Sequence, residues 1–128
     1  PDPRGVLFID DYRPSKSLLK HIRKIKPTIS MNLAFDQVID TCAHIPRTDN
    51  GTWITAEMIQ AYKSLHKSGQ AHSVEVWLND ELIGGLYGVY SNGVFCGESM
   101  FSKQSNGSKI AFHYLVQYLA SFGVKLNF

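Results

Sequence analysis

Apolar residues recur every three or four positions in four stretches of the chain, and this spacing predicts four amphipathic helices. The stretches run over residues 15–25, 32–42, 55–69 and 106–122. Each begins with a polar residue that can accept a hydrogen bond from the free N–H groups of a helix start: Ser15, Asn32, Thr55 and Asn106. Pro27 stops the first helix, and Gly69 and Gly123 close the third and the last.

The apolar sides of these helices are expected to face a core. In the second helix this side consists of Phe35, Val38, Ile39 and Cys42, and in the third of Met58, Ile59, Tyr62 and Leu65. In the last helix it consists of Ile110, Ala111, Tyr114, Leu115, Tyr118, Leu119 and Phe122.

From His72 onwards the pattern changes to an alternation with period two, which is typical of β-strands. It predicts strands over 72–78, 81–90 and 94–101, joined by turns at Asn79-Asp80 and Ser91–Gly93. Short apolar runs at 5–9, 28–31 and 124–128 predict three more strands. This order predicts an α/β (α+β) fold with helices packed on a mostly antiparallel sheet, the order found in small GNAT-like acyltransferases.

The composition is that of a globular protein. The chain has 128 residues, of which 44% are hydrophobic and 19% charged, so it can bury one core, and we expect residues 1–128 to form a single domain. Intrinsic disorder, collagen-like repeats and a disulfide-stapled miniprotein are excluded. The chain shows neither an apolar run long enough to span a membrane nor a signal peptide, which favours a soluble, cytoplasmic protein. The start at Pro1 suggests a piece of something longer.

Cysteines and histidines give no sign of a metal site or a cofactor. Cys42 and Cys96 lie in apolar surroundings without a CxxC pair, so we expect two small buried side chains rather than a disulfide, with Cys42 the more buried. The five histidines show no metal-ligand spacing.

The formal net charge of +2 hides an uneven distribution. The stretch from Arg13 to Lys26 holds six basic and no acidic residues, and the rest of the chain holds seven basic and eleven acidic ones, a net charge of −4. The six are Arg13, Lys16, Lys20, Arg23, Lys24 and Lys26. Such a cluster favours contact with a phosphate backbone, and a merely solvated helix face remains the alternative.

Two features of the predicted hairpin suggest a site. Gly84, Gly85 and Gly88 lie in one strand, where glycine is unfavourable, so close approach of a ligand is favoured over a simple β-bulge. Pairing about the Ser91–Gly93 turn brings this strand near Glu98, whose carboxylate lies among apolar residues. Glu98 is therefore the best candidate for a functional acid, with a satisfied buried acceptor as the alternative.

Other candidates carry weaker signals. The helix start at 106–109 presents N–H groups and Lys109 to an anion, as many helices do. Trp53 follows a glycine-containing loop and is suited to cover a pocket or stack on a base, although core packing is commoner. The chain lacks a GxSxG elbow, a Cys/His pair at catalytic spacing and a Walker loop. Residues 102–106 also lack the acyl-CoA-binding turn of GNAT enzymes, which argues against acetyl-CoA as the donor.

Several blocks of the sequence occur in the order of one known family. They are Pro1–Arg4, Gly51–Thr55, Ala61-Tyr62 with Leu65-His66, Gly69–Trp77, Gly84–Val89, Phe95–Ser102 and Asn106–Lys109. Together they resemble leucyl/phenylalanyl-tRNA–protein transferase, over nearly the whole chain. The AHSVEVW and GESMFS blocks are the most specific.

The resemblance implies a GNAT-like catalytic domain that moves Leu or Phe, and possibly Met, from aminoacyl-tRNA to a protein with N-terminal Arg or Lys. The modified protein is thereby marked for degradation. The resemblance assigns Glu98 a catalytic role and makes Trp53, Tyr62 and Glu98 contacts of the aminoacyl-adenosine end. It places Leu86, Phe95 and Gly97 in the apolar pocket for the Leu or Phe side chain and adds Ser99 as a substrate-binding residue. The basic stretch would bind the tRNA backbone, and no cofactor or metal is implied.

The chain departs from the family pattern at several positions. Arg13 stands where the family usually has His, Lys16 where it has Arg, and Gly107 where it has Ala. At the C-terminus the chain reads Asn127-Phe128, where the family continues with Ile-Asp-x-Gln, whose Asp and Gln belong to the catalytic relay. The family's N-terminal subdomain is also missing.

These departures lead us to expect an incomplete domain with little activity. Two alternatives stay open. The chain could be a non-catalytic tRNA-binding remnant, as the intact basic stretch suggests, or an acyl-CoA N-acetyltransferase, which the fold order alone suggests.

Overall fold

The structure, a computed structural model, describes residues 6–7, 11–45, 54–121 and 125–127. Within these ranges it contains the strands β1 (Val6–Leu7), β2 (Thr28–Met31), β3 (Ala71–Leu78), β4 (Glu81–Ser91), β5 (Val94–Ser102) and β6 (Lys125–Asn127). The helices are α1 (Lys16–Ile25), α2 (Phe35–His44), α3 (Ala56–Lys67) and α4 (Gly107–Ala120). Every predicted helix and strand is therefore present, with shorter ends in several cases.

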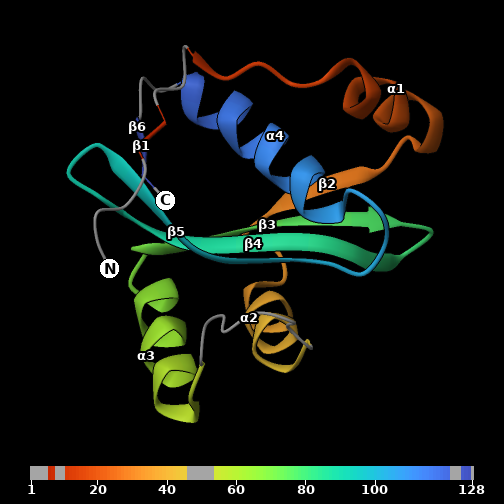
Figure 1. The fold of residues 1–128 in the computed structure, drawn as a ribbon. Helices are drawn as coiled ribbons and strands as arrows, with labels where there is room; N and C mark the ends of the chain where they lie inside the picture. Colours follow the sequence, from red (N-terminus) through yellow and green to blue (C-terminus); the bar gives the residue numbers. More distant parts are fainter. Residues whose placement is uncertain (1–5, 8–10, 46–53, 122–124, 128) are drawn as a thin grey trace.

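One sheet organises the fold, with the strand order β1-β6-β5-β4-β3-β2. The pairing of β5 with β6 is parallel, and all other neighbours are antiparallel. Figure 1 shows α1 and α4 on one face of this sheet and α2 and α3 on the other. The predicted mixed α/β fold with a mostly antiparallel sheet is confirmed.

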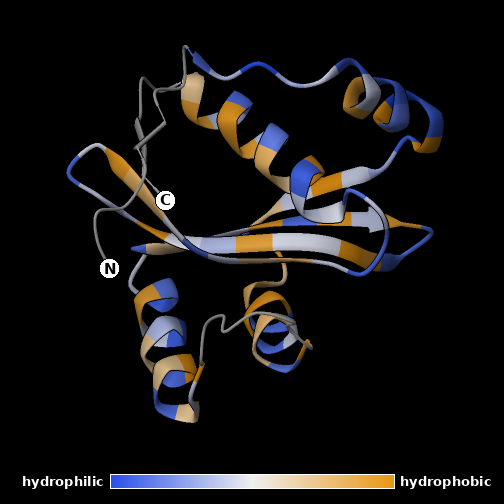
Figure 2. Cartoon of the chain, viewed as in Figure 1, coloured by the Kyte–Doolittle hydropathy of each residue, from blue (hydrophilic) through white to orange (hydrophobic). Residues whose placement is uncertain are grey.

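The core has two parts, one on each face of the sheet. On the α4 face, Val74, Val76 and Leu86 of the sheet pack with Ile110 and Leu115 of α4. On the other face the buried side chains of α2 pack against the sheet: Phe35, Val38, Ile39 and Cys42 against Leu82, Tyr87 and Phe101. Hydrophilic residues cover much of α1, at the rim of the first core (Figure 2).

Two of the four predicted helix caps form as expected. Ser15 Oγ accepts the N–H of Leu18 at 3.0 Å, and Thr55 Oγ1 accepts the N–H of Met58 at 3.1 Å. Gly69 follows α3 with a left-handed φ of +85°, as its predicted closing role requires.

The predicted cap at Asn32 is wrong. Helix α2 starts at Phe35 with Ala34 at the cap position, and Asn32 lies outside the helix with φ 58°. Its side chain hydrogen-bonds His72 and the Ser73 backbone instead. Asn106 does precede α4 but makes no side-chain cap bond.

Burial of the last two helices also differs from the prediction. Tyr118 is 50% exposed, whereas His113, which the pattern left out, is buried. No residue of α3 is fully buried. Phe122 and Gly123 lie outside the described residues.

Protein atoms fill the space beside the three strand glycines. A Cβ on Gly84 would lie 2.4 Å from the backbone carbon of Gly107, and one on Gly88 would lie 2.3 Å from the carbonyl oxygen of Cys96. A Cβ on Gly85 would lie 2.9 Å from the ring of Phe101. Packing of α4 and of aromatic rings, rather than approach of a ligand, therefore accounts for these glycines.

The contact of Gly84 with Gly107 predicts the effect of a Gly84→Ala substitution. The added methyl meets backbone, which cannot rotate away, so we expect a loss of about 1–3 kcal/mol in the free energy of unfolding. Urea unfolding of the chain measures this loss. Ser91→Ala, at the exposed end of the same strand, is the control and should stay within about 0.5 kcal/mol of the parent. Equal stability of Gly84→Ala and the parent would contradict the prediction.

Candidate functional site

Glu98 forms a β-bulge at the middle of the central hairpin. Tyr87 pairs with Ser99 and Gly88 pairs with Gly97, so Glu98 is an extra residue on β5. Bulges redirect a side chain out of the regular alternation of the strand. The predicted closeness of Glu98 to the glycine-containing strand is thus confirmed.

Tyr62 reaches this bulge from α3. Its hydroxyl donates a hydrogen bond to Oε1 of Glu98 at 2.9 Å, and both residues are half-buried. The sequence predicted these two residues as parts of one site, and the structure brings them together although 36 positions separate them. The carboxylate is therefore neither isolated nor sealed in the core.

The other predicted site residues lie at different depths and on different faces. Leu86 and Phe95 are 0% and 2% exposed and belong to the core on the α4 face, whereas Tyr62 packs on the opposite face. Gly97 is buried, and Ser99 is half-buried opposite Tyr87. Trp53 lies outside the described residues.

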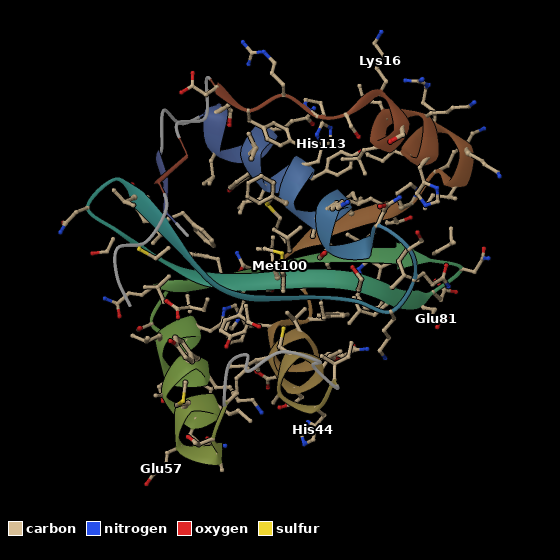
Figure 3. The ribbon with its side chains drawn as sticks, in the orientation of Figure 1. Lys16, His44, Glu57, Glu81, Met100 and His113 are labelled. Atoms are coloured by element: carbon tan, nitrogen blue, oxygen red, sulfur yellow. The ribbon has the colours of Figure 1, made fainter. Side chains whose placement is uncertain are left out.

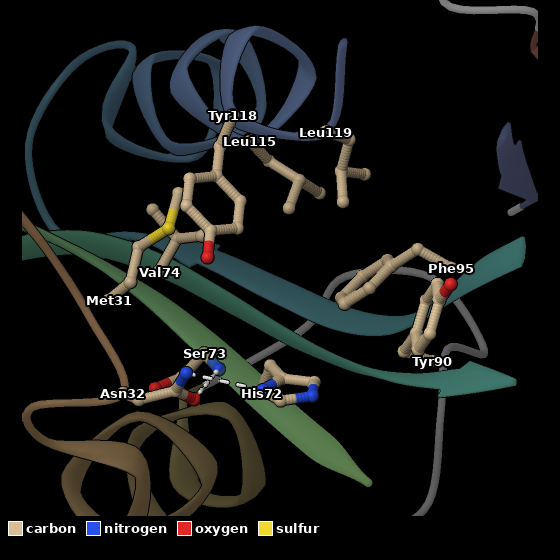
Figure 4. A pocket seen from close by; sticks show the side chains of 10 residues that line it. All are labelled: Met31, Asn32, His72, Ser73, Val74, Tyr90, Phe95, Leu115, Tyr118 and Leu119. Atoms are coloured by element: carbon tan, nitrogen blue, oxygen red, sulfur yellow. Dashed lines mark hydrogen bonds between the residues drawn. The ribbon is translucent and has the colours of Figure 1, made fainter. Parts of the chain in front are cut away.

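A cavity of about 440 Å³ opens between α4 and the sheet. Figure 4 shows side chains of α4 above it and those of the strands below and beside it. Its lining residues are Met31, Asn32, His72, Ser73, Val74, Tyr90, Phe95, Leu115, Tyr118 and Leu119. Phe95 is the one predicted pocket residue among them.

The polar end of this cavity is built around Asn32. Its backbone N–H donates to the carbonyl of Ser73 at 3.0 Å, and its Oδ1 accepts the N–H of Ser73 at 3.1 Å. Its Nδ2 lies 3.1 Å from Nδ1 of His72. Because Oδ1 is the acceptor, Nδ2 is the donor, and His72 Nδ1 accepts.

His72 is thereby held as a neutral ring. Burial lowers the pKa of His72, nearby His66 lowers it further, and a backbone hydrogen bond at Gly69 opposes them. Burial also lowers the pKa of His113, whose Nδ1 lies 3.2 Å from the hydroxyl of Tyr12.

Glu75 is a buried carboxylate that sequence reasoning missed. It is 0% exposed and accepts hydrogen bonds from Ser30 Oγ at 2.5 Å, from the Leu33 N–H at 3.2 Å and from Ser73 Oγ. Trp77 Nε1 donates to the same Ser30 hydroxyl at 2.8 Å. A carboxylate with three donors is satisfied in the core, so Glu75 has a structural role.

The basic stretch forms the outer surface of α1 and the segment before it. All six cations, Arg13, Lys16, Lys20, Arg23, Lys24 and Lys26, are exposed. Figure 3 shows Lys16 directed away from α4. The opposite side of α1 buries Leu18, with Ile22 and Ile25 packed beside it. Helix α1 therefore presents a continuous cationic surface to the solvent.

The start of α4 offers less to an anion than the sequence suggested. The N–H of Ser108 donates to Ser102 Oγ at 2.7 Å, and the N–H of Gly107 donates to the Gln104 carbonyl at 3.0 Å. The Ser102 side chain and the Gln104 carbonyl thus already accept the hydrogen bonds of these two N–H groups.

The described residues give no sign of a metal centre or of a membrane-spanning helix. They contain no group of three His, Cys, Asp or Glu side chains placed to hold a metal ion. None of the helices in the described ranges combines the length and apolar composition that a membrane-spanning helix requires. Cys42 is buried and Cys96 half-buried, and neither forms a disulfide.

Comparison with known proteins identifies close sequence relatives. The profile of the leucyl/phenylalanyl-tRNA protein transferase family matches residues 6–127. A leucyl/phenylalanyl-tRNA–protein transferase of Pseudoalteromonas atlantica is 55% identical over 119 residues, which are 93% of this chain and 51% of the relative. A protein of the same name from Flavobacterium johnsoniae is 53% identical over 127 residues, 98% of this chain and 60% of the relative.

Solved structures share the fold at low sequence identity. L-PGS from Bacillus licheniformis superposes with a TM-score of 0.63 at 14% identity, covering 98% of this chain and 43% of the other. An aminoglycoside acetyltransferase from a soil metagenomic sample gives 0.57 at 13% identity, covering 82% of this chain and 76% of the other. The fold is GNAT-like.

Two histidines, the half-buried His72 and the buried His113, predict a loss of stability in acid. Their pKa values are lowered in the folded chain, so the unfolded chain binds protons more readily. Stability is therefore complete above the ordinary histidine pKa of about 6.5 and falls as the pH drops through that value towards the lower folded-state pKa.

Urea unfolding at pH 7.5, 6.5 and 5.5 measures this loss. His72→Gln and His113→Gln keep a hydrogen-bonding side chain without the titration, so each variant should lose less stability than the parent over this range. A parent and variants with the same pH dependence would show that neither histidine is responsible.

Proposed function

The chain belongs to the leucyl/phenylalanyl-tRNA protein transferase family, and from this premise we propose that its fold serves aminoacyl transfer. In this proposal Leu or Phe, and also Met, passes from aminoacyl-tRNA to the α-amine of a protein with N-terminal Arg or Lys, and the product is marked for degradation. The chain spans about half the length of most of the curated relatives it matches.

The observation that carries the proposal is the Tyr62–Glu98 pair at the bulge. A half-buried carboxylate held by one hydroxyl at 2.9 Å keeps acceptor capacity for a further donor. The α-amine of either substrate is such a donor. Glu98 would hold an amine, or take a proton from one, while Tyr62 keeps the carboxylate in place.

The transfer reaction requires alignment of the amine with the ester more than activation of either group. The attacking amine has a pKa near 8, so part of it is free base at neutral pH, and the aminoacyl ester is already activated. The amine nitrogen bonds to the ester carbonyl carbon, the ester C–O bond breaks, and the tRNA 3′-oxygen leaves with the proton lost by the amine. Holding the two reactants together can contribute roughly 7–11 kcal/mol.

For the two ends of the aminoacyl-adenosine we propose separate contacts. Tyr62 packs on the same face of the sheet as Tyr87, and Ser99 pairs with Tyr87 next to the bulge. Resemblance to the family adds Trp53 to these two residues. By the same resemblance, Leu86, Phe95 and Gly97 would belong to the apolar pocket for the Leu or Phe side chain. An apolar pocket separates side chains by about 1–3 kcal/mol per methylene.

The cationic surface of α1 is proposed to bind the tRNA backbone. A second candidate function, tRNA binding without transfer, is supported by this exposed cationic surface. The likeness to an acetyltransferase concerns the fold alone, and residues 102–106 lack an acyl-CoA-binding turn.

Transfer of labelled leucine from Leu-tRNA to a peptide that begins with Arg tests the proposed function. We expect transfer by a version extended to the relatives' length and far slower transfer by the 128-residue chain itself. In the extended version Glu98→Gln should lower the rate by about 100-fold or more, because it removes the proton acceptor and the negative charge. A Gly-initiated peptide is the control acceptor. Absence of transfer by the extended version would refute the proposal.

The salt dependence of tRNA binding tests the role of α1. Replacing Lys20 and Lys24 by Ala should weaken tRNA binding and reduce the slope of log K against log salt by about one for each phosphate that the variant no longer neutralises. Lys67→Ala, exposed on α3 at the other face, is the matched control and should leave the slope unchanged. Equal slopes for all variants would show that α1 does not contact the tRNA backbone. Equal affinity for leucylated and uncharged tRNA would favour the binding-only alternative.

A further inference from the structure

Tyr62 reaches Glu98 from a helix that is only partly held by the core. Helix α3 has no fully buried residue and rests on the sheet through half-buried side chains, among them Ile59, Tyr62 and Leu65. Holding a half-buried side chain in one rotamer costs conformational entropy. Support from neighbouring contacts offsets this cost and keeps the Tyr62 hydroxyl 2.9 Å from one carboxylate oxygen of Glu98.

The ring of Tyr87 supplies this support. It meets the ring of Tyr62 edge-to-face, with centroids 5.3 Å apart and planes at 69°. Tyr87 is 1% exposed, so its own position is fixed by the core. Edge-to-face contacts are directional, because the positive ring edge meets the negative ring face.

Behind Tyr87 stands a row of further rings. Phe35 meets Tyr87 edge-to-face at 5.9 Å and 77°, and His66 stacks on Phe35 at 4.3 Å and 5°. His66 Nδ1 lies 2.9 Å from the carbonyl oxygen of Ala71, the first residue of β3, and so donates to it. The row connects Tyr62 to the main chain of the sheet.

Tyr87 also lies at the bulge itself. The register shift that makes Glu98 the extra residue of β5 falls between Tyr87 and Gly88. The same residue thus contacts the donor Tyr62 with its ring and adjoins the acceptor Glu98 through the strand pairing. We propose that Tyr87 is a positioning residue that holds the Tyr62 hydroxyl on Glu98. A role of Tyr87 in transfer rests on the proposed function, in which Tyr62 and Glu98 contact the aminoacyl-adenosine end.

The ligand-free chain gives the first test. The side-chain carboxyl carbon of Glu98, observed by ¹³C NMR at pH 7, reports the hydrogen bond that it accepts. Tyr62→Phe removes the donor hydroxyl and calibrates the change. Tyr87→Leu should move the resonance in the same direction as Tyr62→Phe and by at least half as much. Tyr87→Phe should leave the resonance near its original position. Val89→Ala, a half-buried residue of the same strand and core, is the matched control.

A resonance that Tyr87→Leu leaves in place, in a chain that still unfolds cooperatively, would overturn the inference. If Tyr87→Leu does not fold, Phe35→Leu removes the ring behind Tyr87 and should give a smaller change in the same direction. No change in that variant would overturn the inference equally.

Binding of 3′-leucylamino-3′-deoxyadenosine, measured by calorimetry, gives the second test. We expect Tyr87→Leu to weaken binding about tenfold when Tyr62 is present and less than twofold in a Tyr62→Ala background, because Tyr87 acts through Tyr62. Equal losses in both backgrounds would refute a positioning role. If the parent chain does not bind this probe, the proposed site fails while the NMR result still decides the role of Tyr87.

Discussion

The burial of β4 on both of its faces is the constraint on which the rest of the structure depends. Every residue from Leu82 to Gly88 is buried, with α4 packed over one face and α2 over the other. Such a strand leaves no freedom of register, because a slip by one residue would exchange the two cores. The glycines follow from the same constraint, since Gly84 lets α4 approach backbone to backbone. The bulge at Glu98 is the place where β5 departs from this regular pairing.

Two carboxylates of the central strands, Glu75 on β3 and Glu98 on β5, show how position decides role. Glu75, in the middle of β3, is fully buried and surrounded by three donors, so it has little capacity left for a ligand. Glu98 is half-buried and takes one hydrogen bond from Tyr62. A carboxylate that remains accessible beside a rigid strand is suited to a substrate amine, whereas one that is fully satisfied stabilises the fold.

Local patterns predicted the helices and strands well, because the signals that define them involve residues close in sequence. These signals are the helix and strand periods, the caps at Ser15 and Thr55, and the helix end at Gly69. Asn32 was wrong as a cap because its amide finds partners on β3, which is distant in sequence. Glu98 and Tyr62 were predicted together through family resemblance, and no spacing in the chain would have paired them. The cavity was missed because its walls come from five separate elements, β2, β3, β4, β5 and α4. Leu115 and Leu119 look like ordinary core positions until these elements are assembled.

The sequence blocks that identify the family contain residues of two kinds. In AHSVEVW, Glu75 and Trp77 share Ser30 as a hydrogen-bond partner and stabilise the pairing of β2 with β3. In GGLYG, Gly84 and Gly88 make room for backbone and ring. A chain could keep all of these for folding alone, so they are weak support for catalysis. Glu98 differs, because a half-buried carboxylate at a bulge costs pairing and apolar burial that a regular strand would gain. The case for transfer therefore rests on Glu98 and on the residues that hold its partner in place.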